Sequence, residues 1–267
     1  MIVFPNAKIN LGLFITEKRT DGFHNLESLF LPIPLCDILE VTPATEDTSL
    51  VCTGESSDIP TEKNIVYKAW KLLQEAHGIG NVHIHLHKII PSGAGMGGGS
   101  SDGSFMLKAL NELFQLNLSV AQLEDFAAQL GSDCPFFIKN KAALVTGRGE
   151  GVDPIDFNLE GKYLVIVNPG IHISTAQAFQ GIQPKSSQFN WKEFIQNKDF
   201  EKVDLRNDFE QSVFQLYPEI AEIKSTLLHA GALYSSMSGT GSTVYALFDE
   251  EPQLCWAENY FSRTFLL

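Results

Sequence analysis

The chain has 267 residues, 44% of them hydrophobic and 19% charged, which is enough for one large or two ordinary hydrophobic cores, and two domains are expected. Its formal net charge of -13 argues against a nucleic-acid-binding protein, because phosphate backbones are bound by basic surfaces. An anionic small molecule can still bind if the site supplies its own positive potential, since salt screens charges beyond about 8 Å.

Cysteine usage and hydropathy bear on the compartment in which the protein works. The four cysteines are widely spaced without a CxxC pair, and no signal sequence is recognisable ahead of them, which favours a reducing cytoplasm. No apolar run approaches the ~20 residues of a membrane-spanning helix. We therefore expect a cytoplasmic protein that interacts with neither membranes nor nucleic acid.

The spacing of apolar residues predicts the elements of the N-terminal part. In chain order these are two strand segments at 1–16 broken at Pro5, a loop and strand at 21–41, a polar loop at 43–64, a helix at 64–78 and a strand at 81–90. In the last strand, His83, His85 and His87 share one face. Their steps of ~6.5–7 Å are too long to converge on one metal ion, so we expect a solvated strand face.

Two helices and a second set of strands follow. Helices are predicted at 100–116 and 119–131, the first with hydroxyl and carboxylate groups suited to capping and the second with Ser119 and Gln122 spaced as a capping box. Asp133 then falls on a loop. A strand enters a Gly/Pro/Asp-rich connector at 147–161, where we place the boundary between domains 1–156 and 157–267. The second domain is predicted to contain a strand at 163–169, helices at 174–182 and 218–231, two strands around a glycine turn at 232–248, and a helix at 252–261.

The run PSGAGMGGGSSDGS, residues 91–104, lies between a predicted strand and a predicted helix and holds six glycines. Glycine is usually kept where the backbone takes positive φ or approaches another group closely. Backbone N–H groups in such a loop, followed by a helix N-terminus, form an anion site because unsatisfied donors and the helix dipole both favour negative charge. Phosphate is the expected ligand.

Three nucleotide motifs can be compared with this run. A P-loop requires a lysine that is missing here. A GxGxxG pattern is present at Gly93, Gly95 and Gly98, but the second strand and acidic residue of a dinucleotide site do not follow. A kinase-type loop that covers a triphosphate remains, with the hydroxyls of Ser100 and Ser101 able to contact phosphate oxygens.

The segment PSGAGMGGGSSD resembles the phosphate loop of the GHMP kinases, the superfamily of galactokinase, homoserine kinase, mevalonate kinase and phosphomevalonate kinase. Further segments in matching order are similar to the members that act on 4-diphosphocytidyl-2-C-methyl-D-erythritol. These are PNAKINLGLFITEKRTDGFHNLESLF, LGSDCPFF, VNPGIHISTAQAF, NDFE and MSGTGSTVYALF. The resemblance implies a two-domain α+β fold, with a ribosomal-protein-like N-terminal domain, a ferredoxin-like C-terminal domain and substrates in the cleft between them.

The same resemblance implies a reaction in isoprenoid (terpenoid) precursor biosynthesis by the non-mevalonate route. The γ-phosphoryl group of ATP, accompanied by Mg²⁺, would be transferred to the 2-hydroxyl of the cytidylyl substrate. Alternatives are a sibling kinase for mevalonate, homoserine or a sugar, and a nucleotide-binding protein without turnover. The segment DGFH argues against the siblings, because their acceptors offer no base to stack on. The expected assembly is a monomer or weak homodimer.

The resemblance assigns catalytic and acceptor roles to five residues. Asp133 would bind the substrate hydroxyl and accept its proton, and Lys8 would keep this carboxylate ionised and favour the anionic transition state. A lone aspartate after a helix is more often a turn residue than a catalytic one. Lys8 lies among apolar strand residues, an unfavourable place for an ammonium group that has no function. Asn10 would contact the polyol or its phosphate end, Phe23 would stack on the cytosine and His24 would hydrogen-bond its polar edge. Phe23 stands where tyrosine is more usual, so stacking is kept and a hydroxyl contact is lost.

The nucleotide-binding residues that the resemblance implies lie mainly in the glycine run. They are Pro91, Gly93, Ala94, Gly95, Met96, Gly97, Gly98, Gly99, Ser100 and Ser101, with Asn64 and Lys88 near the adenosine. Ser238, Gly239, Thr240 and Gly241 would form a second glycine turn that packs the C-terminal domain against the active site. Gly103 stands where alanine is common, and we expect it to loosen the first helical turn by up to ~1 kcal/mol. No protein metal ligand is expected.

Overall fold

The computed structural model describes residues 1–55, 59–200 and 203–267, which form two compact units. The first unit comprises Met1–Ala7, Pro34–Ser92 and Gly97–Lys141, and the second comprises Lys8–Ile33, Gly93–Met96 and Ala142–Leu267. Both units combine helices with sheets, as the predicted α+β class requires. The domain boundary after residue 156 stays a prediction.

The first unit contains a four-stranded sheet of order β1-β4-β6-β5. Its strands are β1 (Ile2–Val3), β4 (Ile38–Pro43), β6 (Val82–Lys88) and β5 (Ser49–Gly54). β4 is antiparallel to both of its neighbours, and β5 runs parallel to β6 at the edge of the sheet. Buried and exposed residues alternate along β6, so its apolar face is available to the helices.

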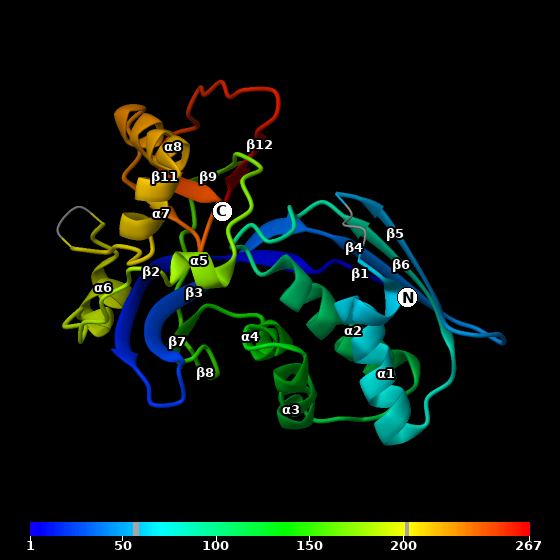
Figure 1. Ribbon diagram of the computed structural model, residues 1–267. Helices are drawn as coiled ribbons and strands as arrows, with labels where there is room; N and C mark the ends of the chain where they lie inside the picture. Colours follow the sequence, from blue (N-terminus) through cyan, green and yellow to red (C-terminus); the bar gives the residue numbers. More distant parts are fainter. Residues whose placement is uncertain (56–58, 201–202) are drawn as a thin grey trace. The chain divides into compact units, whose positions relative to one another are not determined.

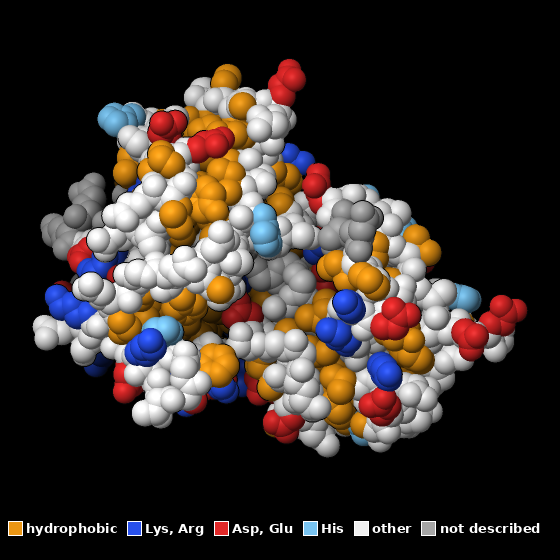
Figure 2. Space-filling model, viewed as in Figure 1, with side chains coloured by type: hydrophobic (Ala, Val, Ile, Leu, Met, Phe, Trp, Pro, Cys, Tyr) orange, Lys and Arg blue, Asp and Glu red, His pale blue; other side chains and the backbone are white. Residues whose placement is uncertain are grey.

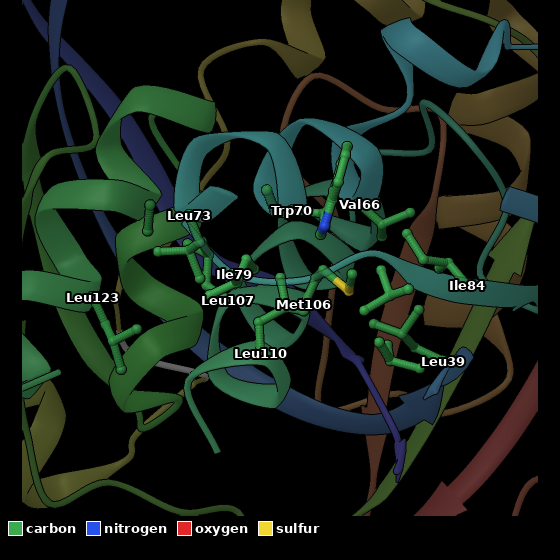
Figure 3. Packing of buried hydrophobic residues seen from close by; sticks show 14 of the residues in the cluster. Leu39, Val66, Trp70, Leu73, Ile79, Ile84, Met106, Leu107, Leu110 and Leu123 are labelled. Carbon is green, nitrogen blue, oxygen red and sulfur yellow. The ribbon is translucent and has the colours of Figure 1, made fainter. Parts of the chain in front are cut away.

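Helices α1 and α2 lie against one face of this sheet, with α3 and α4 beside α2 (Figure 1). Their bounds are η1 (Thr61–Lys63), α1 (Ile65–His77), α2 (Gly98–Leu113), α3 (Val120–Leu130) and α4 (Cys134–Lys139). Figure 3 shows the core that they enclose with the sheet. The labelled side chains are Leu39 and Ile84 from the sheet, Val66, Trp70, Leu73, Met106, Leu107, Leu110 and Leu123 from the helices, and Ile79 after α1. This packing fixes the end of β6 and the start of α2, between which the loop of residues 89–97 lies.

The capping signals predicted for two helices of the first unit, α1 and α3, are confirmed. Gly78 ends α1 with a φ of 65°, a left-handed conformation that glycine adopts readily. Ser119 and Gln122 form the predicted capping box at the start of α3. These interactions define where each helix begins and ends.

The second unit contains two four-stranded sheets, of order β2-β3-β7-β8 and β10-β11-β9-β12, except for the first two residues of β2 and the last three of β3, which belong to the first unit. The strands are β2 (Asn6–Lys18), β3 (His24–Cys36), β7 (Ala143–Gly147), β8 (Gly151–Pro154), β9 (Tyr163–Asn168), β10 (Tyr234–Met237), β11 (Val244–Phe248) and β12 (Phe261–Leu266). The helices are α5 (Thr175–Ala178), α6 (Trp191–Asn197), α7 (Glu210–Leu216) and α8 (Pro218–His229). Apolar residues of β2, β9, β11, α7 and α8 share one buried cluster.

Several sequence-based element predictions are wrong. The segment 43–64, which was expected to be a loop, contains β5 and η1. β5 is stabilised by pairing with β6, although its Leu50 and Cys52 are only half buried. Residues 252–261 do not form a helix: they run through loop and turn into β12, which pairs with β9. The helix expected at 174–182 ends at Ala178, and helices α4, α6 and α7 were not predicted.

On the face drawn in Figure 2, Lys and Arg side chains lie among Asp and Glu side chains. No helix within the described part of the chain has the length and hydropathy needed to cross a bilayer.

Candidate active site

Helix α2 starts within the glycine run. α2 begins at Gly98 with Gly97 as its N-cap, and no side chain caps it. The prediction that hydroxyl and carboxylate groups cap this helix is therefore wrong, because Ser101 and Asp102 lie inside the helix and are buried. The N-terminal N–H groups of α2 have no side-chain cap, an arrangement that suits an anionic ligand.

Two buried polar atoms at the start of α2 have no hydrogen-bond partner among the residues described. They are the Oγ of Ser101 and the Oδ1 of Asp102. A buried hydroxyl without a partner is unfavourable unless a further group satisfies it. Ser101 was predicted to contact the nucleotide, and its position fits a ligand that brings phosphate oxygens.

Lys88 ends β6 and enters a buried group of charges. Its Nζ donates to Asp37 and, at 2.7 Å, to the Oδ2 of Asp102. Burial raises the pKa of Asp102 to about 8; Lys88 opposes this rise, and the charge of Asp37 adds to it. The Lys88 ammonium is thus held by the carboxyl groups of Asp37 and Asp102, and its predicted place near the adenosine stays a prediction.

Two other predicted site residues lie at helix starts in the first unit. Asn64 is the N-cap of α1, where its Oδ1 accepts the N–H of Val66 at 3.1 Å. This contact gives Asn64 a structural role whether or not it also meets the adenosine. Asp133 precedes α4 and is half buried, and its side chain does not cap that helix. The structure therefore agrees with its predicted place beside a helix end.

Lys8 and Asn10 lie two residues apart in β2 of the second unit, and both are buried, at 3% and 1% exposure. The Nζ of Lys8 donates to the Oδ1 of Asn10 at 2.6 Å and lies 4.3 Å from the centre of the Phe30 ring. The backbone N–H of Lys8 donates to the carbonyl of Met96 at 3.0 Å. The predicted catalytic lysine is therefore bound directly to the glycine run.

The second glycine turn also contacts the glycine run within the second unit. Ser238 Oγ donates to the carbonyl of Gly95 at 2.9 Å, and Thr243 N–H donates to the carbonyl of Ala94 at 3.3 Å. A Cβ on Gly95 would lie 2.0 Å from the carbonyl oxygen of Ser238, and the φ of Gly95 is +79°. Only glycine fits there, because the two backbones approach so closely.

Asn10 connects Lys8 to this turn. Its Nδ2 donates to Ser28 Oγ at 2.9 Å, and its Oδ1 also accepts from Ser238 Oγ at 3.4 Å. The hydroxyl of Tyr245 donates to the backbone carbonyl of Asn10. Buried polar groups that are this fully hydrogen-bonded hold one geometry.

Sequence comparisons agree with these features. Family models for the GHMP kinases N terminal domain and the GHMP kinases C terminal region match residues 64–141 and 190–255. A 4-diphosphocytidyl-2-C-methyl-D-erythritol kinase from Bacteroides thetaiotaomicron is 50% identical over 268 residues, 98% of each chain. The chain belongs to the GHMP kinase family.

Solved structures of GHMP kinases have the same fold. The crystal structure of a 4-(cytidine 5'-diphospho)-2C-methyl-D-erythritol kinase is 32% identical, with a TM-score of 0.80, and covers 92% of this chain and 90% of its own. A homoserine kinase from Cytophaga hutchinsonii, 18% identical with a TM-score of 0.65 over 97% of this chain and 93% of its own, shares the fold alone. The predicted fold class and the prediction of a small-molecule kinase are confirmed.

Two of the predicted acceptor residues of this GHMP kinase, Phe23 and His24, lie where the turn between β2 and β3 meets β3. Phe23 is 55% exposed, and the guanidinium of Arg148 lies 5.0 Å from the centre of its ring. His24 stacks on Phe179 with ring centres 4.7 Å apart. Burial, with the charge of Lys18, lowers the pKa of His24, so its imidazole is neutral near neutral pH.

The sequence did not indicate the supporting roles of Asn207 and Glu210 at the second glycine turn or of Phe179 at His24. Asn207 Nδ2 donates to the carbonyls of Met237 and Gly239 at 2.7 and 2.8 Å, and Glu210 Oε1 accepts from Met237 N–H at 2.8 Å. Both belong to the segment NDFE, whose resemblance to the family was the available signal. Phe179 is the last residue of the segment STAQAF, and nothing in the neighbouring sequence indicated that it stacks on His24.

The structure brings together Lys8, Asn10, part of the glycine run and the second glycine turn in the second unit. In the first unit it brings the start of α2 together with Lys88. Asp133 belongs to the first unit and Lys8 to the second, so their joint action stays a prediction. No group of three or more His, Cys, Asp or Glu side chains that would hold a metal ion occurs within residues 1–55, 59–200 and 203–267.

Proposed function

We propose that this GHMP kinase transfers the γ-phosphoryl group of ATP to the 2-hydroxyl of 4-diphosphocytidyl-2-C-methyl-D-erythritol. The observation that carries the proposal is the hydrogen bond from Lys8 N–H to the carbonyl of Met96. It joins the strand of the catalytic lysine to the loop that would hold the triphosphate. Phosphoryl transfer depends mainly on such positioning and on charge stabilisation.

In this proposal Asp133 accepts the proton of the 2-hydroxyl as the oxygen attacks the γ-phosphorus. Lys8 neutralises negative charge that spreads over the transferred group, and Asn10 fixes the Lys8 ammonium through the 2.6 Å hydrogen bond. Burial of Lys8 and Asn10 excludes water and strengthens these interactions. The ammonium therefore acts from a fixed position.

The acceptor would be recognised through its cytosine ring. Phe23 is exposed enough to stack on a base, a contact worth about 1–3 kcal/mol. Because Arg148 lies over the Phe23 ring, a stacked base must use the opposite face or displace the guanidinium. His24, neutral and held on Phe179, can donate or accept a hydrogen bond at the polar edge of the base.

ATP would bind with its phosphates against the glycine run and the start of α2, where Ser101 Oγ is buried without a partner among the described residues. Mg²⁺ would arrive with ATP and supply positive charge at the phosphates, since it keeps several waters and needs few protein ligands. The proposal includes a cytoplasmic enzyme that acts as a monomer or weak homodimer and binds no nucleic acid.

Release of ADP by the purified protein tests the function. ATP and Mg²⁺ are supplied with one of four acceptors: the cytidylyl substrate, mevalonate, homoserine or galactose. We expect turnover with the cytidylyl substrate alone. Turnover with another acceptor would remove the base-stacking role of Phe23, and no turnover with all four would favour a nucleotide-binding protein without activity.

A further inference from the structure

The loop between β6 and α2, residues 89–97, contains the first part of the glycine run, and its two ends are joined by buried polar side chains that have no part in the proposed chemistry. Lys88 is the last residue of β6, before this loop, and Asp102 lies near the start of α2, after it. Asp37 lies between β3 and β4 and is 0% exposed. All three residues belong to the first unit.

Asp37 holds the chain that enters the run. Its Oδ1 accepts the N–H groups of Ile89 and Ile90 at 2.5 and 2.8 Å, and its Oδ2 accepts from Lys88 Nζ. Three consecutive residues are thus bound to one carboxylate. This backbone segment leads directly into Pro91, where the glycine run begins.

Lys88 extends the connection to the chain that leaves the run. Its Nζ donates to Asp102 Oδ2 at 2.7 Å. The start of α2 is also packed closely on the end of β6, because a Cβ on Gly98 would lie 2.9 Å from Ile90 Cγ2. Asp37, Lys88 and Asp102 therefore form a bridge between the two ends of the loop.

Such a bridge adds little to the stability of the fold if packing is its only role. Buried ion pairs are often no more stabilising than hydrophobic residues of similar volume, because the charges lose their hydration. The loop contains Gly93, Gly95 and Gly97, all at positive φ, and these glycines leave its backbone with unusual freedom. A phosphate site needs N–H groups at fixed positions, so it benefits from fixed loop ends.

We propose that Asp37, through Lys88 and Asp102, is a positioning residue that fixes both ends of the phosphate-binding loop for ATP. Asp37 contacts the loop's flanking backbone and not the substrates. Its contribution is to ATP binding, with the acceptor site left unchanged. The inference rests on the proposed function, because it concerns the loop that would hold ATP.

Three variants test the bridge. Asp37→Asn keeps the shape and an oxygen for Ile89 and Ile90 but turns an amide nitrogen toward Lys88. Asp102→Leu has similar size and removes the acceptor for Lys88, whereas Asp102→Asn keeps an acceptor oxygen and is the matched control. The measurements are the Kd for ADP by calorimetry, the KM for ATP and for the cytidylyl acceptor, and thermal unfolding to verify folding.

We expect Asp37→Asn and Asp102→Leu to raise the Kd for ADP and the KM for ATP at least about tenfold, with the acceptor KM within about twofold of wild type. Asp102→Asn should stay close to wild type. If the role of Asp37 and Asp102 were merely structural, their variants would change thermal stability without raising the KM for ATP more than the KM for the acceptor. An ADP Kd within about twofold of wild type in folded Asp37→Asn and Asp102→Leu would overturn the inference.

Two further outcomes separate the inference from the function. If the wild-type protein binds no ADP, the proposed function fails and the inference fails with it. If it binds ADP but neither variant folds, amide hydrogen exchange measured on the wild-type protein tests whether the backbone at Ile89 and Ile90 is held in place. Exchange of Ile89 and Ile90 as slow as that of β6 supports the bridge, and exchange as fast as that of exposed loops overturns it.

Discussion

Asp133 carries the proton-transfer step of the proposed reaction. Asp133→Asn keeps the size of the side chain and removes its basicity, so kcat should fall at least ~10²-fold with little change in ATP affinity. Steady-state kinetics and ADP binding measure the two effects. Asp125→Asn, an exposed residue of α3, is the matched control and should behave as wild type. Unchanged kcat in Asp133→Asn would remove this residue from the mechanism.

In the proposed function, recognition of the cytidylyl group depends on Phe23. Phe23→Ala should raise the KM for the cytidylyl substrate about tenfold or more and leave that for ATP unchanged, because one stacking contact is lost. Phe4→Ala is the matched control, since Phe4 is 57% exposed and Phe23 is 55% exposed. Equal effects of Phe23→Ala on both substrates would show that its role is structural.

Asp102 should also make folding stability depend on pH. Because burial raises its pKa from 3.8 to about 8, the folded protein keeps a proton that the unfolded chain releases, and this contribution is lost as pH rises from about 4 to about 8. Asp102→Asn carries no such proton. Its free energy of unfolding in urea should therefore fall less than that of wild type between about pH 6 and about pH 9. Parallel curves for the two proteins would contradict this assignment.

At the scale of elements, Gly103 shows how helix packing differs from local propensity. A Cβ at this position would lie 2.8 Å from Ile65 Cγ1, so the glycine permits close packing of α1 on α2 and the expected loosening is not its main effect. Gly103→Ala should destabilise the protein by about 1–3 kcal/mol through overpacking.

Gly99→Ala is the matched control in the same helix, because nothing lies within 4 Å of a Cβ there. It should be neutral or stabilising by up to about 1 kcal/mol, since alanine is the better helix former. Urea unfolding of both variants measures the difference. If Gly103→Ala proves as stable as Gly99→Ala, the close approach of α1 and α2 is not rigid.

Elements with strong local signals could be predicted from the sequence. α1, β6 and α3 have clear periodicity and caps, and their predicted places are confirmed. β5 could not be predicted, because its polar residues gain strand structure only by pairing with β6. The segment 252–261 has a composition compatible with a helix, but it does not form a helix. Its residues Leu254, Trp256 and Tyr260 pack against the core of the second unit from loop and turn structure.

The predicted site shows the same division between local and long-range information. The burial of Lys8 followed from its apolar neighbours in a strand pattern, and the glycine run was evident from composition. The role of Asp37 had no local signal, because it pairs with Lys88 at a separation of 51 residues. Phe179 and Arg148 likewise meet His24 and Phe23 only in the folded second unit.

At the scale of the whole molecule, a net charge of -13 opposes the binding of anionic nucleotides at long range. In the proposed function, Lys8, the start of α2 and Mg²⁺ supply the local positive potential. Activity should be lost when Mg²⁺ is chelated by excess EDTA and return when Mg²⁺ is restored, as measured by ADP release. Full turnover in excess chelator would contradict this account of charge.

The proposed reaction phosphorylates the 2-hydroxyl, and phosphorus NMR of the product distinguishes this hydroxyl from the others. Carbon 2 of the acceptor carries a methyl group and no hydrogen. The new phosphomonoester signal should therefore lack coupling to a proton on the esterified carbon, while the diphosphate signals of the cytidylyl group remain. A new signal split by one or two carbinol protons would place the phosphate on another hydroxyl and contradict the proposed reaction.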